Sequence, residues 1–497
     1  MKTVLSFTNS GLHENRWSRF LIHSLFALLL VVSVSSCGAI KPVEDPEKEN
    51  DYSLHSFSFD ASINGAAGMT SSSLVRINPK SNLIYFTVNE GSDLTKLIPT
   101  VTSGEGTRIY INGAPVESGK SVVDFSETST LVLESEDGRI NKYLICGKTG
   151  NRAIDDAVYN LMIRYDIPGV SISANVDEEL AYSYGYGFAN TVTKERVTPN
   201  HLFRLASISK SQTALCIMTL VEQGKLKLSD RLFGEGGIFE EELGTDLVDG
   251  AENVTVQNML EHASGWKGEH IFSNYINGSA VLRGKDVLGR MKYVVQNVPL
   301  TYQPGTRYSS YNMGYGLLGE VIKKISGKEY EDFLREDVYA KAGVKDIWCG
   351  GDQFHRRENE VVYYSQDGRD GYGNDMELIQ SLGGLIASGP ELMKVMASID
   401  YGTKVPDILS KETLDVMYTP SVASPGQYSK GWRTNHTVFT NWENYHGGNL
   451  AGTATLWYRS TDGTAAVILC NSRNYESYFD TALFDVLAVI QKNVKNL

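Results

Sequence analysis

Cysteine is scarce in this chain, with five among its 497 residues. The five are far apart and have neither the spacing of a disulfide framework nor that of a zinc site, which argues against a small disulfide-bonded scaffold. Cys37 follows an apolar run and needs its own explanation. The other four are predicted to be small core residues: Cys146, Cys216, Cys349 and Cys470.

Positive charge is also limited, because 46 Lys and Arg residues stand against 59 Asp and Glu residues and leave a formal net charge of −13. A protein that neutralises nucleic-acid phosphates needs a basic surface. We therefore expect no nucleic-acid partner.

A metal-binding motif of the His-Glu-x-x-His type is missing as well. Glu261-His262 and Glu269-His270 could suggest a site, but they are eight residues apart, and Gly265 interrupts any helix that would align them. The sequence therefore predicts no metal and no other cofactor.

The N-terminus has the composition of a targeting segment. Residues 1–37 begin with basic residues, continue with an apolar run over 20–34 and end in Ser35-Ser36-Cys37. This pattern resembles a bacterial lipoprotein signal, which implies that Cys37 carries lipid and anchors the chain in the cell envelope, at the outer membrane, on its periplasmic or its outer side. A buried helix or an ordinary secretory signal is the alternative.

Two further segments precede the main domain. Residues 41–51 hold five acidic residues and almost nothing apolar, so the segment 38–55 is predicted to be a disordered tether. Residues 56–148 contain short β-rich runs separated by turn signals such as Asn112-Gly113 and Asp137-Gly138, which predicts a small β-sandwich. This segment resembles the immunoglobulin-like modules of surface lipoproteins, which implies a spacer or, alternatively, a contact with a glycan or a protein.

The strongest chemical signal is Ser207-Ile208-Ser209-Lys210, followed at once by an apolar run that ends at Gly224. A serine and a lysine three residues apart on a helix share one face, so the amine can act as a base beside the hydroxyl. Ser264-Gly265-Trp266-Lys267 has the same spacing but no apolar helical run behind it. We therefore predict Ser207 as the nucleophile, against an alternative in which it merely caps a helix.

The region 152–497 combines helices and strands. Apolar periodicity predicts helices near 154–165 and 479–490, and strands at 170–176, 180–186 and in a hairpin over 454–469. Strands at both ends with helical segments between them predict an α+β fold, in which an antiparallel sheet is flanked by helices and carries a mostly helical subdomain.

A series of short motifs follows along this region. The motifs are Pro168-Gly169, Gly185-Tyr186-Gly187, Phe203 to Lys210, Leu260 to Gly265, Pro304-Gly305-Thr306, Gly314 to Gly319, Gly383-Gly384 and His446-Gly447-Gly448. Their identity and order resemble those of the penicillin-recognising serine hydrolases, the superfamily of class C β-lactamases, DD-peptidases, D-aminopeptidases and related esterases. The resemblance also implies that Ser264-Gly265 is a structural loop.

The second motif of that superfamily is Tyr-x-Asn, and this chain has Ser310-Tyr311-Asn312 in its place. The resemblance then implies Lys210 as the general base, Ser310 as a proton relay and Asn312 as a hydrogen-bond donor to the substrate or to Lys210. Tyr311 or Tyr308 could supply a hydroxyl instead, and Tyr311 is also predicted to contact the substrate.

The third motif is His446-Gly447-Gly448. Glycines let a substrate backbone approach closely, with Gly448 next to the substrate, and the resemblance makes the backbone N–H groups of Ser207 and Asn449 the oxyanion hole. His446 replaces a permanent cation and is mostly neutral at pH 7, which disfavours an anionic β-lactam.

The sequence therefore predicts a serine hydrolase that forms an acyl-enzyme on Ser207 with a small-molecule or peptide substrate. Neutral esters are the first expected substrates, followed by D-amino-acid peptides and then β-lactams. The alternative is a non-catalytic surface binding protein that retains the hydrolase fold.

Overall fold

The structure is a computed structural model that describes residues 51–434 and 442–497. The predicted signal, Cys37 and most of the predicted tether lie outside the described residues.

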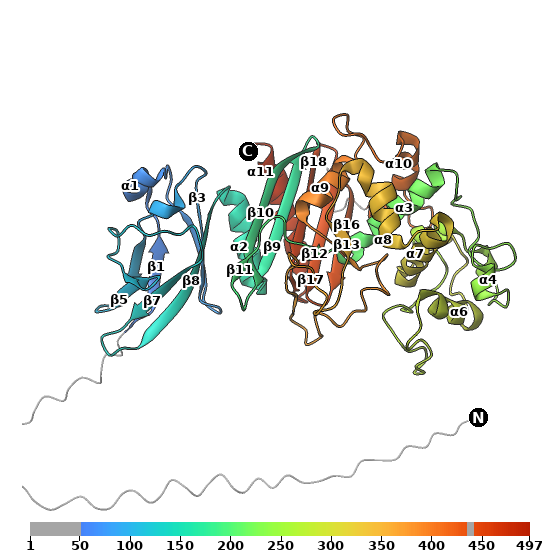
Figure 1. Cartoon of the computed structure of the whole chain (residues 1–497), viewed down its shortest axis with the longest axis horizontal. Coiled ribbons are helices and arrows are strands. Elements are labelled where there is room, and N and C mark those ends of the chain that lie inside the picture. Colours follow the sequence, from blue (N-terminus) through green and yellow to red (C-terminus); the bar gives the residue numbers. More distant parts are fainter. Residues whose placement is uncertain (1–50, 435–441) are drawn as a thin grey trace, which may run out of the picture. The chain divides into compact units, whose positions relative to one another are not determined.

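A six-stranded antiparallel sheet combines strands from both ends of the region 152–497 (Figure 1). Its order is β11-β10-β9-β18-β17-β16, with β16 at one edge. This arrangement confirms the predicted fold class. The strands are β9 (Gly169–Val176), β10 (Glu179–Asn190), β11 (Glu195–Arg196), β16 (Trp442–Leu450), β17 (Thr453–Ser460) and β18 (Thr464–Cys470).

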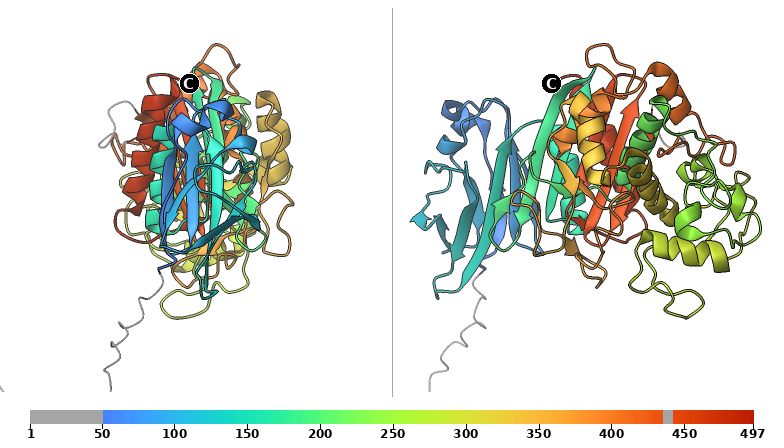
Figure 2. Two further views of the ribbon diagram at one scale, coloured as in Figure 1. Left: turned by 90° about the vertical axis from the view of Figure 1, so that its left-hand side faces the viewer. Right: turned by 45° about the vertical axis from the view of Figure 1, so that its right-hand side comes forward.

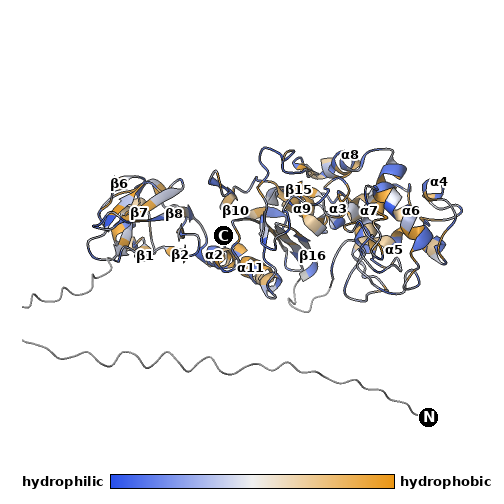
Figure 3. Cartoon of the chain, turned by 90° about the horizontal axis from the view of Figure 1, so that it is seen from below, coloured by the Kyte–Doolittle hydropathy of each residue, from blue (hydrophilic) through white to orange (hydrophobic). Residues whose placement is uncertain are grey.

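Helices cover both faces of this sheet (Figure 2). On one face, α2 (Arg152–Tyr165) and α11 (Phe479–Val494) pack against alternate residues of the strands, such as Ile172 and Ile468. The predicted terminal helices are therefore confirmed, and hydrophobic residues are visible along α11 in Figure 3. On the other face, α9 (Gly389–Ala397) packs against β9 and β18.

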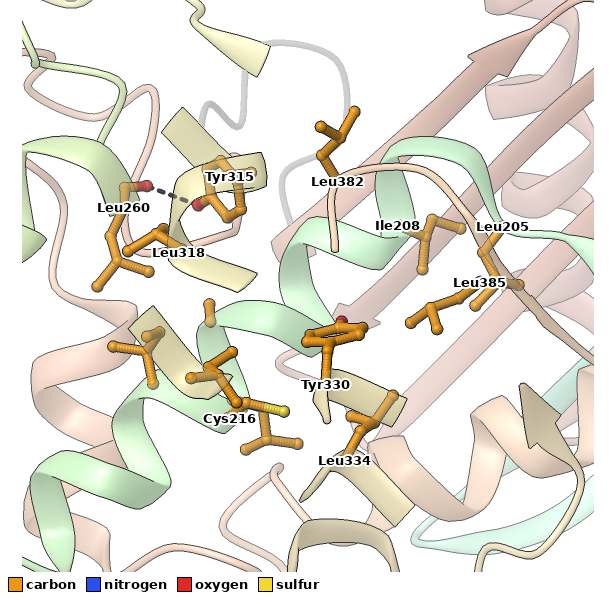
Figure 4. Close-up of a cluster of buried hydrophobic side chains, with 14 of the residues drawn as sticks. Leu205, Ile208, Cys216, Leu260, Tyr315, Leu318, Tyr330, Leu334, Leu382 and Leu385 are labelled. Atoms are coloured by element: carbon orange, nitrogen blue, oxygen red, sulfur yellow. Dashed lines mark hydrogen bonds between the residues drawn. The ribbon is translucent and has the colours of Figure 1, made fainter. Parts of the chain in front are cut away.

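The segment between β11 and β16 is mostly helical and irregular, as predicted. A large hydrophobic core holds it together, and Figure 4 shows part of that core, including Leu205 and Ile208, which flank Ser207 in the sequence. A three-stranded sheet, β12-β15-β13, lies in the same region. The elements are β12 (Phe203–Arg204), α3 (Ser209–Glu222), α4 (Glu240–Leu243), α5 (Val256–Leu260), α6 (Val287–Asn297), α7 (Asn312–Ser326), α8 (Tyr330–Phe333), β13 (Ile347–Cys349), β14 (Tyr364–Ser365), β15 (Leu385–Ala387) and α10 (Lys411–Tyr418); β14 pairs with β19 (Ser472–Arg473).

The N-terminal part of the described chain consists mainly of strands. A six-stranded sheet of order β2-β3-β8-β7-β5-β6 and the pair β1-β4 surround a core that includes Phe57, Phe59, Phe86 and Phe125. The predicted likeness to an immunoglobulin-like module stays a prediction. The elements are β1 (Leu54–Ser58), α1 (Ala61–Asn64), β2 (Leu74–Asn78), β3 (Leu83–Val88), β4 (Thr100–Ser103), β5 (Arg108–Ile111), β6 (Ala114–Pro115), β7 (Ser129–Glu134) and β8 (Ile140–Thr149).

The described cysteines are unpaired, as predicted. Cys146, Cys216 and Cys470 are buried, and Cys349 is partly exposed. Across residues 51–434 and 442–497, no helix is both long and apolar enough to cross a membrane.

Candidate active site

Ser207 lies in a short 3₁₀ turn, Ala206–Ile208, which leads directly into α3. The sequence predicted that the serine opens the helix, and the structure places Ser207 two residues before Ser209, the first residue of α3. Most of α3 is buried, and the helix ends before Gly224, whose φ of +68° belongs to the left-handed region expected after a helix. A buried helix therefore holds the turn that carries the serine.

The Lys210 amine lies next to the serine hydroxyl. Lys210 Nζ is 2.7 Å from Ser207 Oγ and donates to the Leu382 carbonyl at 3.1 Å. Burial lowers the pKa of Lys210 to about 7, the Glu269 carboxylate opposes this shift, and the Arg433 guanidinium adds to it. A large fraction of Lys210 is therefore neutral near pH 7 and can accept the proton of Ser207.

The edge strand β16 passes close to the turn that holds the serine. A Cβ atom on Gly448 would lie 2.1 Å from Thr455 Oγ1 and 2.5 Å from the Leu205 carbonyl oxygen, so only glycine fits there. Thr455 Oγ1 donates to the same carbonyl at 2.9 Å and fixes the sheet to the turn. Ser207, Gly448 and Asn449 all line one cavity, as an oxyanion hole built from Ser207 and Asn449 requires.

His446 is buried on β16 and lines the same cavity. Its Nδ1 is 2.8 Å from the Gly447 carbonyl and must carry the proton, so Nε2 accepts from the Tyr428 hydroxyl at 3.2 Å. Burial lowers the pKa of His446 well below its usual range, and the charges of Lys210 and Arg433 lower it further. His446 is therefore neutral at pH 7, so this position of the third motif supplies no positive charge to an anionic substrate.

The second motif places two of its three residues at the cavity. Ser310 and Asn312 line it, although the Asn312 side chain donates to Glu269 Oε2 at 2.9 Å and not to Lys210. Tyr311 is 1% exposed and its hydroxyl lies 2.9 Å from His270 Nδ1. The prediction that Tyr311 contacts the substrate is therefore wrong, because this residue, which directly precedes α7, turns its ring into the core.

The cavity has a volume of about 490 Å³ and includes groups that sequence reasoning did not assign to the site. His262 follows α5 within the Leu260 to Gly265 motif, Tyr428 and Arg433 lie in the irregular segment before β16, and the other groups lie on β16, β17, β19 and α11. Tyr308, the predicted alternative source of a hydroxyl, also lines this cavity. The unassigned residues are His262, Tyr428, Arg433, Tyr445, Thr455, Leu456, Arg473, Asp480, Leu483 and Phe484.

The residues weighed as metal ligands have other partners. Glu261 forms a buried ion pair with Lys430 at 2.8 Å, and His262 Nδ1 accepts from the Tyr311 backbone N–H at 3.0 Å. Ser264 is buried while Lys267 is exposed, so the second Ser-x-x-Lys match does not form a site.

Comparison with sequence families gives one description for this region. A family model described as Beta-lactamase matches residues 154–490. That range contains every residue of the cavity.

Curated proteins with detectable similarity include penicillin-binding proteins. The chain is 22% identical over 328 residues to penicillin-binding protein 4* of Bacillus subtilis (strain 168), which covers 61% of this chain and 68% of that protein. It is 22% identical over 333 residues to a putative D-alanyl-D-alanine carboxypeptidase of Escherichia coli O157:H7, and this match covers 61% of this chain and 75% of that protein. Penicillin-binding protein 4 of Amycolatopsis lactamdurans is 27% identical over 186 residues, but the match spans only 45% of that protein.

Solved structures show the same fold. The octameric penicillin-binding protein homologue from Pyrococcus abyssi has a TM-score of 0.56 at 24% identity and covers 67% of this chain and 76% of that one. D-amino acid amidase from Ochrobactrum anthropi SV3, complexed with L-phenylalanine amide, has a TM-score of 0.54 at 22% identity, and the match covers 69% of this chain and 99% of that one. At these identities the likeness extends to the fold alone.

Proposed function

Because this chain belongs to the β-lactamase family, we propose that it is a serine hydrolase that forms an acyl-enzyme on Ser207. The observation that supports this most directly is the 2.7 Å contact between Ser207 Oγ and a Lys210 amine whose pKa is about 7. A binding protein without turnover has no need to bury a lysine beside a serine at the mouth of a cavity.

The reaction follows from this pair. Neutral Lys210 takes the proton of Ser207 while Oγ attacks the substrate carbonyl, and the oxyanion that forms accepts from the backbone N–H groups of Ser207 and Asn449. The proton on Lys210 then passes to the leaving group, directly or through the Ser310 hydroxyl, as the carbonyl bond to that group breaks. Water attacks the resulting ester, releases the acid and returns the proton to Ser207.

Arg433 bears on the choice of substrate. The expectation that neutral esters come first depended on His446 replacing a cation, but the Arg433 side chain lines the same cavity and forms no ion pair with the described residues. A guanidinium keeps its charge at any relevant pH and suits a carboxylate. We therefore place substrates with a free carboxylate beside the scissile bond first, in particular D-amino-acid peptides, in keeping with the names of the carboxypeptidase and amidase relatives.

The test compares two peptides that end in D-Ala-D-Ala, one with a free carboxylate and one with a carboxamide. We expect kcat/KM to favour the free acid by about tenfold to a hundredfold, since a charge-assisted hydrogen bond contributes about 1.5–3 kcal/mol. Arg433→Gln should remove this preference, because any change in the Lys210 amine affects both peptides alike and only the free acid loses its contact with the guanidinium. Equal rates for the two peptides in the wild type would contradict the role of Arg433, and no turnover of any acyl substrate would favour the non-catalytic alternative.

We also propose that lipid on Cys37 holds the protein at the cell envelope, with β1–β8 as a spacer between the tether and the hydrolase. The pattern of residues 1–37 supports the anchor. A contact of this spacer with a glycan or a protein remains the second possibility for its role.

A further inference from the structure

Glu269 lies in the irregular segment between α5 and α6, and several donors hold its carboxylate. Oε2 accepts from Asn312 Nδ2 at 2.9 Å. Oε1 accepts from the backbone N–H groups of Ile271 at 2.9 Å and Phe272 at 3.2 Å. The position of this negative charge is therefore well fixed.

The contact with Glu269 decides the orientation of the Asn312 amide. An ionised carboxylate only accepts hydrogen bonds, so the amide must turn its NH₂ group towards Glu269. Asn312 lines the cavity as the first residue of α7, and its Oδ1 is then directed away from the carboxylate. Asn312 thus offers the cavity an acceptor in a fixed orientation, along with its second N–H.

Charged and titratable groups surround Lys210 from several elements. Glu269 supplies the negative charge in this set, and Arg433 the competing positive charge. His262 and His446 both have pKa values well below the usual range through burial, and the Lys210 charge contributes to each shift, so both rings are neutral. Burial raises the pKa values of Tyr315 and Tyr428, so both phenols are neutral as well.

We propose that Glu269 is a positioning residue for acyl transfer, which fixes the Asn312 amide and stabilises the ammonium that forms when Lys210 takes the Ser207 proton. This inference depends on the proposed acyl-enzyme chemistry. Without the carboxylate, Lys210 is a weaker base: it is neutral at lower pH but accepts the proton less readily in the transition state. Loss of Glu269 therefore shifts the rise of the acylation rate to lower pH and also lowers the rate that is reached at high pH.

The experiment measures the second-order rate constant for labelling of Ser207 by a fluorophosphonate between pH 5 and 9 in the full chain. In Glu269→Gln we expect the midpoint of the rising limb to move down by on the order of one pH unit, and the plateau to fall at least fivefold. Arg433→Gln should move the midpoint up, because it removes the opposite charge. Glu241→Gln is the matched control, because it removes one negative charge at an exposed position on α4. It should leave the midpoint and the plateau unchanged.

Further variants separate charge from local structure. Glu269→Asp keeps the charge and should keep the midpoint within a few tenths of the wild-type value, and Glu269→Ala repeats the loss of charge if Glu269→Gln does not fold. A midpoint that stays in place in a folded Glu269→Gln or Glu269→Ala protein overturns this inference. Failure of the wild type to label, or equal labelling of Ser207→Ala, would instead overturn the proposed acyl-enzyme, so the two failures are distinguishable.

Discussion

Lys210 is 3% exposed, and burial is the main reason why its amine can act as a base near neutral pH. Lys210→Ala should abolish acylation, because no other amine contacts Ser207 among the described residues. Tyr311→Phe should cost less than about tenfold, since the Tyr311 hydroxyl lies against His270 away from the cavity. The wild type should show a matching pH dependence. Its acylation rate should rise as the pH passes through about 7, because only the neutral Lys210 amine takes the proton of Ser207.

These rates can be followed by the burst of leaving group from an activated ester. Substantial acylation by Lys210→Ala, together with a large loss in Tyr311→Phe, would return the role of base to a tyrosine.

At the residue scale, the sequence allowed prediction of functional residues that lie close together along the chain. Ser207 and Lys210 could be recognised because their relation depends on a three-residue spacing that one turn brings together. Arg433 and Tyr428 could not, because they lie in an irregular segment more than 200 residues away from Ser207, and only the fold brings that segment to the cavity. Tyr311 was misassigned because its side chain, on the residue that precedes α7, points into the core.

Among the elements, β16 must lie unusually close to the turn that holds Ser207. Gly448→Ala should displace the strand, since the new methyl group would collide with Thr455 Oγ1 and with the Leu205 carbonyl. We expect a lower melting temperature and a loss of labelling of at least a hundredfold. Gly447→Ala is the matched control, because its Cβ would have 3.5 Å to the nearest backbone oxygen, and its melting temperature should remain close to that of the wild type.

The comparison requires thermal melting and labelling on the same samples. Equal melting temperatures for the two variants would contradict the close approach of β16.

The spacing of apolar residues predicted the helices and strands that bury one face in the core. The helices α2 and α11 and the hairpin of β17 and β18 were found in this way, because apolar residues recur at the helical or strand period. The short strands β12, β13 and β15 have two or three residues each, which is too few to form a pattern. Their pairing depends on contacts between distant segments, so it could not be predicted from the sequence.

On the scale of the whole molecule, a buried polar cluster links the N-terminal strands to the hydrolase. Asp155 on α2 is fully buried and accepts from Lys148 Nζ of β8 at 2.8 Å, from Thr87 Oγ1 of β3 at 2.9 Å and from the hydroxyl groups of Tyr182 and Tyr186 of β10 at 3.1 and 2.6 Å. Specific buried contacts therefore hold the N-terminal strands against α2 and β10.

Asp155→Asn should lower the free energy of unfolding by about 3 kcal/mol, because it leaves the buried Lys148 ammonium without its counter-charge. The neighbouring Asp156→Asn breaks only a partly exposed pair with Arg76 and should cost less than about 1 kcal/mol. Denaturant titration of both variants gives the comparison, and a similar small loss in each would mean that the cluster does not stabilise the junction.

The proposed anchor also belongs to the scale of the whole molecule. If Cys37 carries lipid, the protein should enter the detergent phase in phase-partitioning experiments, because each buried methylene contributes about 0.8 kcal/mol. Cys37→Ser should return the protein to the aqueous phase. Partitioning that is the same in both proteins would rule out lipidation at this residue.

The central claim is that Ser207 becomes acylated. Intact mass spectrometry after incubation with a fluorophosphonate or a penicillin, followed by peptide mapping, tests it most directly. We predict one adduct per chain, located on Ser207, formed faster above pH 7 than below it, and missing from Ser207→Ala. A folded wild-type protein that forms no adduct with either reagent, or an adduct of equal yield in Ser207→Ala, would contradict the account.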